Sequence, residues 1–257
     1  MRIAAVGDLH AGQDSRGTIA PSFADVGRRA DLLLLAGDLT THGAAEQAEI
    51  LAEEVRGVHI PIVAVLGNHD HHLDTPEAVR GVLERAGIVV LERESIEIEI
   101  AGERVGIVGA KGFGGGFVGA SATEFGEPEM KSFIRTTIDI ADDVERLLAE
   151  LTSDVRVLLL HYGPIRDTLH GEPPEIFPFL GSYLLAEAAD RAGADFIVHG
   201  HAHRGVEQGS TPGGVPVRNV AKAVLRKAYG VYVVEPRRRR AATQMSARRF
   251  EVAGSGK

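Results

Sequence analysis

Five short segments of the sequence carry side chains that bind metal ions and transfer protons, and each directly follows an apolar run. In chain order they hold Asp8 and His10, then Asp38, then Asn68, His69 and Asp70, then His161, and finally His201 and His203. Carboxylates offset the charge of metal ions and neutral imidazoles bind borderline transition ions, so this mixture suits a hydrolytic site with two metals. Such a site needs one oxygen that bridges both ions, and Asp38 is the candidate.

The apolar runs before these segments predict buried β-strands, because they are rich in Val, Ile and Leu and are bounded by Gly or Asp. The expected strands lie at residues 3–6, 32–36, 62–66, 105–108, 155–160 and 196–198. Helix-like segments lie at about 44–56, 76–86, 139–151 and 183–192. This alternation predicts a layered α/β domain. Ligands bind outside the carboxyl ends of strands in open α/β sheets, so the five segments can converge on one crevice.

A hairpin makes the predicted sheet mixed. Residues 95–100 alternate isoleucine with glutamate, a turn follows at 101–104, and the chain returns as a strand. Later strands are expected at 215–220, 229–235 and about 242–252, with the arginine run at 237–240 as a turn. His201 and His203 flank a small alanine, which suits extended backbone that turns both side chains to one face. The pair can then serve adjacent ions.

Composition narrows the class of protein. A chain of 257 residues, 44% of them hydrophobic, can bury one enzyme-sized core, so we expect residues 1–257 to form a single domain. The net charge of −8 argues against nucleic acids and anionic membranes as partners and favours small molecules. No cysteine occurs, which excludes cysteine-ligated zinc and fits a reducing cytoplasm. Neither a signal peptide nor a membrane span is expected, so we predict a cytoplasmic location.

Two long segments fit neither strand nor helix. They lie at about residues 112–133, which include three consecutive glycines, and at 162–180, which include four prolines. Long loops usually carry function, so we expect both on the substrate side of the domain, the first as a flexible lid. The glycine run is also compatible with an anion-binding nest, although it lacks the lysine and hydroxyl ending of a nucleotide loop.

Taken together, the five segments resemble the motif set of the calcineurin-like metallophosphoesterase family. That set reads D-x-H, G-D, G-N-H-D/E, a lone H and G-H-x-H, and all five blocks occur here between Asp8 and His203. The resemblance implies a sandwich of two mixed β-sheets flanked by helices. It also implies a binuclear, metal-dependent phosphoester hydrolase that uses Mn or Fe by preference, with Zn, Co or Ni as alternatives.

The same resemblance implies a role for each residue. One ion is held by Asp8, His10, Asp38 and His203, and the other by Asp38, Asn68, His161 and His201. A bridging water or hydroxide attacks phosphorus, and His69 protonates the leaving oxygen as general acid. The other histidines match no ligand position, and most are expected at the surface or in packing. Weaker candidates for contact with substrate phosphate or the outer shell of the metals are His42, His71 and His72.

The second motif separates branches of the family. Protein phosphatases carry G-D-x-x-D-R-G, whose Asp orients the catalytic histidine and whose Arg grips phosphate, whereas residues 37–43 here read G-D-L-T-T-H-G. The partner of His69 therefore stays open, with Asp70 and Asp74 as candidates. The shorter motif is closer to bacterial cyclic-nucleotide phosphodiesterases, so we expect a small phosphodiester substrate such as a cyclic nucleotide. A small phosphomonoester is the alternative. The negative charge argues against a nuclease, and the complete ligand set argues against a non-catalytic scaffold.

Overall fold

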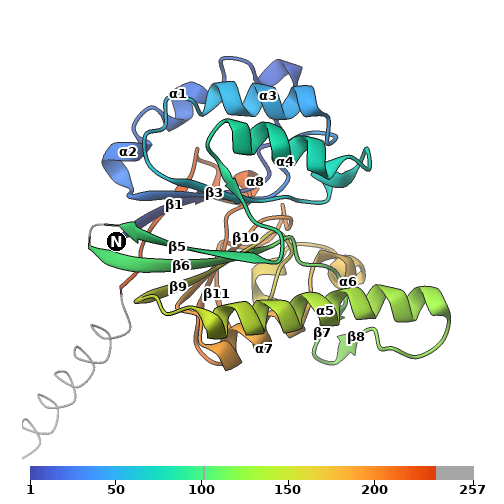
Figure 1. Ribbon diagram of the computed structural model, residues 1–257. Coiled ribbons are helices and arrows are strands. Elements are labelled where there is room, and N and C mark those ends of the chain that lie inside the picture. The colour runs from blue at the N-terminus through green and yellow to red at the C-terminus, as the bar shows by residue number, and fades with distance from the viewer. Residues whose placement is uncertain (101, 236–257) are drawn as a thin grey trace, which may run out of the picture.

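The computed structural model describes residues 1–100 and 102–235. Two mixed β-sheets pack against each other, and helices cover the outer face of each sheet (Figure 1). The layered α/β class and the sandwich of mixed sheets are therefore confirmed. The strand expected at 242–252 and the arginine turn at 237–240 lie outside the described residues.

The first sheet has five strands in the order β13, β1, β2, β3 and β4. Their bounds are Gly230–Val233, Arg2–Val6, Leu32–Ala36, Ile62–Val65 and Val89–Val90. Strands β1 to β4 are parallel, and β13 pairs antiparallel with β1. Every residue of β2 is buried, which explains its unbroken apolar run. The outer face is covered by helices α1 (Ala20–Phe23), α2 (Val26–Arg29), α3 (Ala45–Glu54) and α4 (Pro76–Arg85) (Figure 1).

The second sheet has six strands in the order β11, β12, β10, β9, β6 and β5. Their bounds are Gln208–Ser210, Pro216–Asn219, Phe196–His199, Val155–Leu160, Glu103–Ala110 and Glu94–Ile100. The four central strands are parallel and the two edge strands are antiparallel, so the predicted hairpin forms one edge. Helices α5 (Pro128–Glu150) and α7 (Tyr183–Ala192) pack on the outer face (Figure 1).

Alternate residues of the central strands enter two different cores. Ile107 of β6 and Leu159 of β9 belong to the core between the sheets. Val108 and Leu158 belong to the core under α5 and α7. This period of two fixes which residues beyond the strand ends point between the sheets.

The segments predicted as long loops contain more regular structure than expected. Helix α5 begins at Pro128 rather than at residue 139, so the end of the 112–133 segment is helical. Proline suits the first turn of a helix, and the buried Ile134 and Thr137 continue the apolar stripe at helical spacing. The same segment also holds a small hairpin of β7 (Gly116–Phe117) and β8 (Ala120–Ser121). The 162–180 segment ends in helix α6 (Phe177–Leu180) after two short 3-10 turns.

Helix α8 (Lys222–Leu225) completes the helices of the described residues. Within that part of the chain, no helix combines the length and the apolar character that crossing a membrane requires.

Candidate metal centre

The carboxyl ends of strands from both sheets meet at one edge of the sandwich. After β1 and β2, the amide of Asp8 donates to the carbonyl of Gly37 over 2.9 Å. His161, which follows β9 in the other sheet, places its Nδ1 2.9 Å from the carbonyl oxygen of Ala36 in β2. The His161 bond thus joins the two sheets at the point where the predicted site residues emerge.

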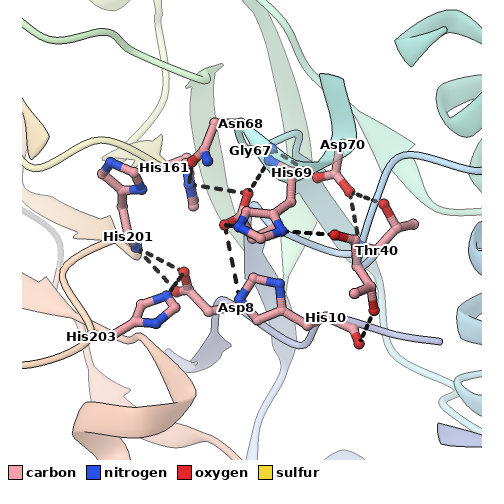
Figure 2. Close-up of polar contacts among 12 residues, drawn as sticks. Asp8, His10, Thr40, Gly67, Asn68, His69, Asp70, His161, His201 and His203 are labelled. Atoms are coloured by element: carbon pink, nitrogen blue, oxygen red, sulfur yellow. Dashed lines mark hydrogen bonds and ion pairs between the residues drawn. The ribbon is translucent and has the colours of Figure 1, made fainter. Parts of the chain in front are cut away.

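Two groups of ligand-type side chains form at this edge. The ligand atoms of Asp8, His10, Asp38 and His203 all lie within 4.8 Å of one another, and those of Asp38, His161 and His201 form a second group. Asp38 belongs to both groups. Asn68 stands beside the second, with its Oδ1 3.0 Å from His161 Nε2. Figure 2 shows Asp8, His10, His161 and His203 around a common centre, with Asp70 and Thr40 to one side.

The backbone at this edge adopts conformations that side chains other than glycine rarely take. Asp8, His10, Asp38 and His201 have φ values of 58°, 47°, 49° and 68°. A left-handed backbone costs roughly 1–2 kcal/mol for each such residue. These conformations turn successive side chains toward the centre, so the strain lies where the candidate ligands are.

The expectation of extended backbone at His201 and His203 is wrong. Strand β10 ends at His199, and His201 is left-handed, so the chain turns instead of continuing the strand. Because of this turn, His201 joins the Asp38 and His161 group, while His203 Nε2 lies 2.8 Å from Asp8 Oδ1. The two imidazoles still reach different groups, by a tight turn rather than by a shared face.

Hydrogen bonds and burial set the state of the imidazoles. The Nδ1–H of His161 donates to Ala36, which leaves Nε2 facing Asp38 Oδ1 at 3.3 Å. Burial lowers the pKa of both His161 and His201 to about 3, so both are neutral at pH 7. Burial raises the pKa of Asp8 to about 6, and the hydrogen bond to Asp8 raises the pKa of His203. Neutral imidazole is the form that binds metals.

His69 lies beside both groups without belonging to either. Its Nδ1 is 2.7 Å from the carbonyl oxygen of Thr41, and its Nε2 is 3.9 Å from Asp38 Oδ2. The ring is therefore oriented by a main-chain carbonyl, with Nε2 directed into the centre (Figure 2).

A sequence model of the calcineurin-like phosphoesterase family matches residues 1–205. The chain belongs to this family. It is therefore a phosphoester hydrolase, and its family uses two metal ions. A comparison with curated proteins finds no match.

Solved structures share the fold of this phosphoesterase at low sequence identity. A phosphopantetheinyl hydrolase from Mycobacterium tuberculosis is 17% identical with a TM-score of 0.66, over 91% of this chain and 96% of that one. A provisionally assigned 5′-nucleotidase from Staphylococcus aureus is 16% identical with a TM-score of 0.57, over 91% of this chain and 53% of that one. A purple acid phosphatase from yellow lupin is 14% identical with a TM-score of 0.51, over 81% of this chain and 38% of that one.

Asp70 of the phosphoesterase holds two motif loops together. Its buried carboxylate accepts hydrogen bonds from the amides of Leu39, Thr40 and Gly67 and from the Thr40 hydroxyl. These bonds tie the loop after β2 to the loop after β3. The Asp70 carboxylate therefore stabilises the loops. The Thr41 carbonyl, and neither of the candidates Asp70 and Asp74, is the hydrogen-bond partner of His69 Nδ1.

The remaining histidines differ in their surroundings. His199 is fully buried, with Nε2 2.8 Å from the Thr168 hydroxyl, so it is a packing residue as expected. His42 and His72 lie near each other, with ring centroids 5.8 Å apart. His71 has a buried Nε2 with no hydrogen-bond partner in the described residues.

Two features of the site were missed in the sequence. Lys111, directly after β6, is close enough to Asp38 for that carboxylate to act on its ammonium, although burial lowers the pKa of Lys111. A pocket of about 380 Å³ also adjoins the centre. It is lined by Glu172, Pro173, Ile176, Leu180, His201, His203 and Arg204. The sequence did hold one indication of Lys111: like the candidate ligands, it directly follows an apolar strand.

Changing Gly67 to alanine should loosen the site, because the new Cβ would lie 2.1 Å from Asp38 Oδ1 and 2.3 Å from its amide nitrogen. We expect a loss of roughly 1–3 kcal/mol in the free energy of unfolding, together with reduced metal content. Gly57→Ala is the matched control, since nothing lies within 4 Å of its new Cβ. Denaturant unfolding and metal analysis check both variants. Equal stability and equal metal content in Gly67→Ala and Gly57→Ala would contradict the predicted clash with Asp38.

The buried His199 should make stability depend on pH. Burial lowers its pKa from 6.5 to about 4, so below pH 6.5 the unfolded chain takes up a proton that the folded chain refuses. Relative to His199→Gln, the metal-free wild type should lose about 1.2 kcal/mol of unfolding free energy between pH 6 and pH 5. Denaturation at several pH values measures the difference, and His59→Gln controls for loss of an exposed imidazole. A difference that does not vary with pH would contradict the burial argument.

Proposed function

We propose that the described residues act as one metallophosphoesterase domain that hydrolyses a small phosphodiester at a centre of two transition-metal ions. The observation that carries the proposal is the position of Asp38 in both groups of ligand-type side chains. A carboxylate shared in this way suits two adjacent ions, since its two oxygens can bind one each or one can bridge both.

The donor set fits two such ions. We assign Asp8, His10, Asp38 and His203 to one and Asp38, Asn68, His161 and His201 to the other. His161 offers Nε2 because its Nδ1 bonds Ala36. Second-shell bonds of this kind fix the ring orientation and tautomer of metal-binding histidines. Oxygen and imidazole donors without thiolates suit Mn or Fe, and they accept Zn, Co or Ni.

The protein's own groups then supply orientation and a proton. Ions bound at such a centre provide Lewis acidity and lower the pKa of water. His69 is oriented by the Thr41 carbonyl, and its Nε2 points past Asp38 into the centre. Protonated at Nε2, it can donate to the oxygen of the departing group while Nδ1–H remains bonded to Thr41. We therefore assign His69 as the general acid.

The organic part of the substrate has a place beside the centre. The pocket of about 380 Å³ joins His201 and His203 to the apolar Pro173, Ile176 and Leu180. A cavity of this size suits a small molecule and does not suit a folded protein. A cyclic nucleotide is our first substrate class. Phosphopantetheinyl esters and 5′-nucleotides are further substrates to test, because two structural neighbours are named for them.

Hydrolysis of bis-p-nitrophenyl phosphate and p-nitrophenyl phosphate, with and without added Mn²⁺, tests the proposal. We expect metal-dependent cleavage with a higher kcat/KM for the diester. A preference for the monoester would replace the diesterase assignment by a phosphomonoesterase with the same centre. If the metal-loaded protein cleaved neither ester nor any cyclic nucleotide, the proposed function would be wrong.

A further inference from the structure

We propose that Lys111 binds a non-bridging oxygen of the substrate's phosphoryl group, as the cationic side chain that positions this group beside the second ligand set. The proposal rests on the proposed function and names a residue that none of the family's motif blocks contains.

The register of the second sheet places Lys111 next to His161. Ala110 pairs with Leu160 in the parallel β6 and β9 strands, so Lys111 and His161 are neighbours just beyond the strand ends. The amides of His161 and Tyr162 both donate to the Lys111 carbonyl, over 3.1 and 3.0 Å. The backbone of Lys111 is thus fixed against a residue assigned to the second ion.

The period of two directs the Lys111 side chain between the sheets. Ile107 in β6 and Leu159 in β9 belong to the core between the sheets. Even steps along each strand lead from them to Lys111 and His161, which therefore share that face. The added Cβ of the intervening Gly109 would touch Leu91 and Val65, which confirms that this face meets the first sheet.

The surroundings of the ammonium leave its charge available. Nζ lies 5.5 Å from the centroid of the Phe113 ring, and the carboxylates that act on it are those of Glu92 and Asp38. Glu92 uses Oε2 to accept the Lys111 amide at 3.0 Å. Among the described residues, no carboxylate oxygen comes within 4.0 Å of Nζ to form an ion pair. A phosphoryl oxygen would supply that partner.

His71 provides an independent sign of an oxygen-binding position. Its Nε2 is buried without a hydrogen-bond partner in the described residues. Burial lowers the pKa of the His71 ring, and the charge of Lys111 adds to that effect. Buried polar atoms normally have partners, so the unpaired His71 nitrogen fits a ligand oxygen bound near it.

Charge complementarity explains why this enzyme needs Lys111. In the protein-phosphatase branch an arginine of the second motif grips phosphate, but His42 stands at that position here. The His42 amide bonds Gln47, and its ring lies near His72. Phosphoryl transfer spreads negative charge over the equatorial oxygens, and a cation fixed nearby stabilises that charge. Lys111 supplies this cation from a different strand.

Binding of inorganic phosphate to the metal-loaded protein tests the proposal without turnover. Calorimetry on Lys111→Gln should show a Kd raised by about 10- to 100-fold, the usual effect of one lost charged hydrogen bond. Lys111→Arg should recover part of the affinity because it keeps the charge. Lys227→Gln, which changes an exposed lysine, should match the wild type. In the ester assay, Lys111→Gln should raise KM as well.

An unchanged phosphate Kd in Lys111→Gln would remove Lys111 from the site. A fall in metal content in that variant would assign the residue to the metal centre instead of the phosphoryl group. If the wild type hydrolysed none of the esters, the proposed function would fail, whereas the phosphate titration would still decide the role of Lys111.

Discussion

His69→Ala should lower kcat by about 10²- to 10⁴-fold, the range expected when a general acid is lost. The metal content should stay at the wild-type level, because His69 is in neither group of ligand-type atoms. Steady-state kinetics and metal analysis of the same preparation measure both quantities. His59→Ala, which removes an exposed imidazole away from the site, is the matched control.

Esters with different leaving groups show whether His69 acts as the proton donor. An alkoxide needs a proton to depart, whereas p-nitrophenolate departs readily without one. The loss in His69→Ala should therefore be larger for an alkyl ester than for a p-nitrophenyl ester with the same phosphoryl group. Equal losses for the two esters would remove His69 as the proton donor and leave it a positioning role at most.

Asp38→Asn should impair both metal positions and abolish most activity, because Asp38 is the one residue common to both groups. An amide oxygen is a weaker, uncharged donor and leaves a binuclear centre short of negative charge. The matched control is Asp74→Asn, which makes the same change at an exposed residue that also has a positive φ, 56° against 49° for Asp38.

Asp8→Asn tests whether Asp38 differs from a residue that binds only one ion. Asp8 belongs only to the first group, so its replacement should weaken one ion and spare the other. Metal titration followed by mass spectrometry counts the ions in each variant. Equal losses in Asp8→Asn and Asp38→Asn would contradict the special role of Asp38.

The parts of the fold that were predictable from sequence are those dominated by burial. Strand β2 is five apolar residues with every position buried, and the predicted bounds 32–36 match it. The hairpin of β5 and β6 was visible because isoleucine alternates with glutamate on a half-exposed edge. Helix α5 was predicted only from residue 139, because the glycine-rich stretch before it hid the helical positions at Ile134 and Thr137.

The candidate site was predictable in its residue types and not in its backbone. The motifs place acidic, amide and imidazole groups after the strands, and the sheets bring those groups together. The left-handed turn at His201 and the Thr41 carbonyl that orients His69 depend on main-chain geometry, which side-chain identity does not reveal. Lys111 was missed because its position in space follows from the pairing of β6 with β9.

Anomalous diffraction from crystals of the Mn²⁺-loaded protein tests whether two ions share Asp38. We expect two anomalous peaks separated by about 3.5–4 Å, one beside Asp8, His10 and His203 and the other beside Asn68, His161 and His201, with the Asp38 carboxylate between them. A single peak, or two peaks that do not both contact Asp38, would contradict the binuclear centre proposed here.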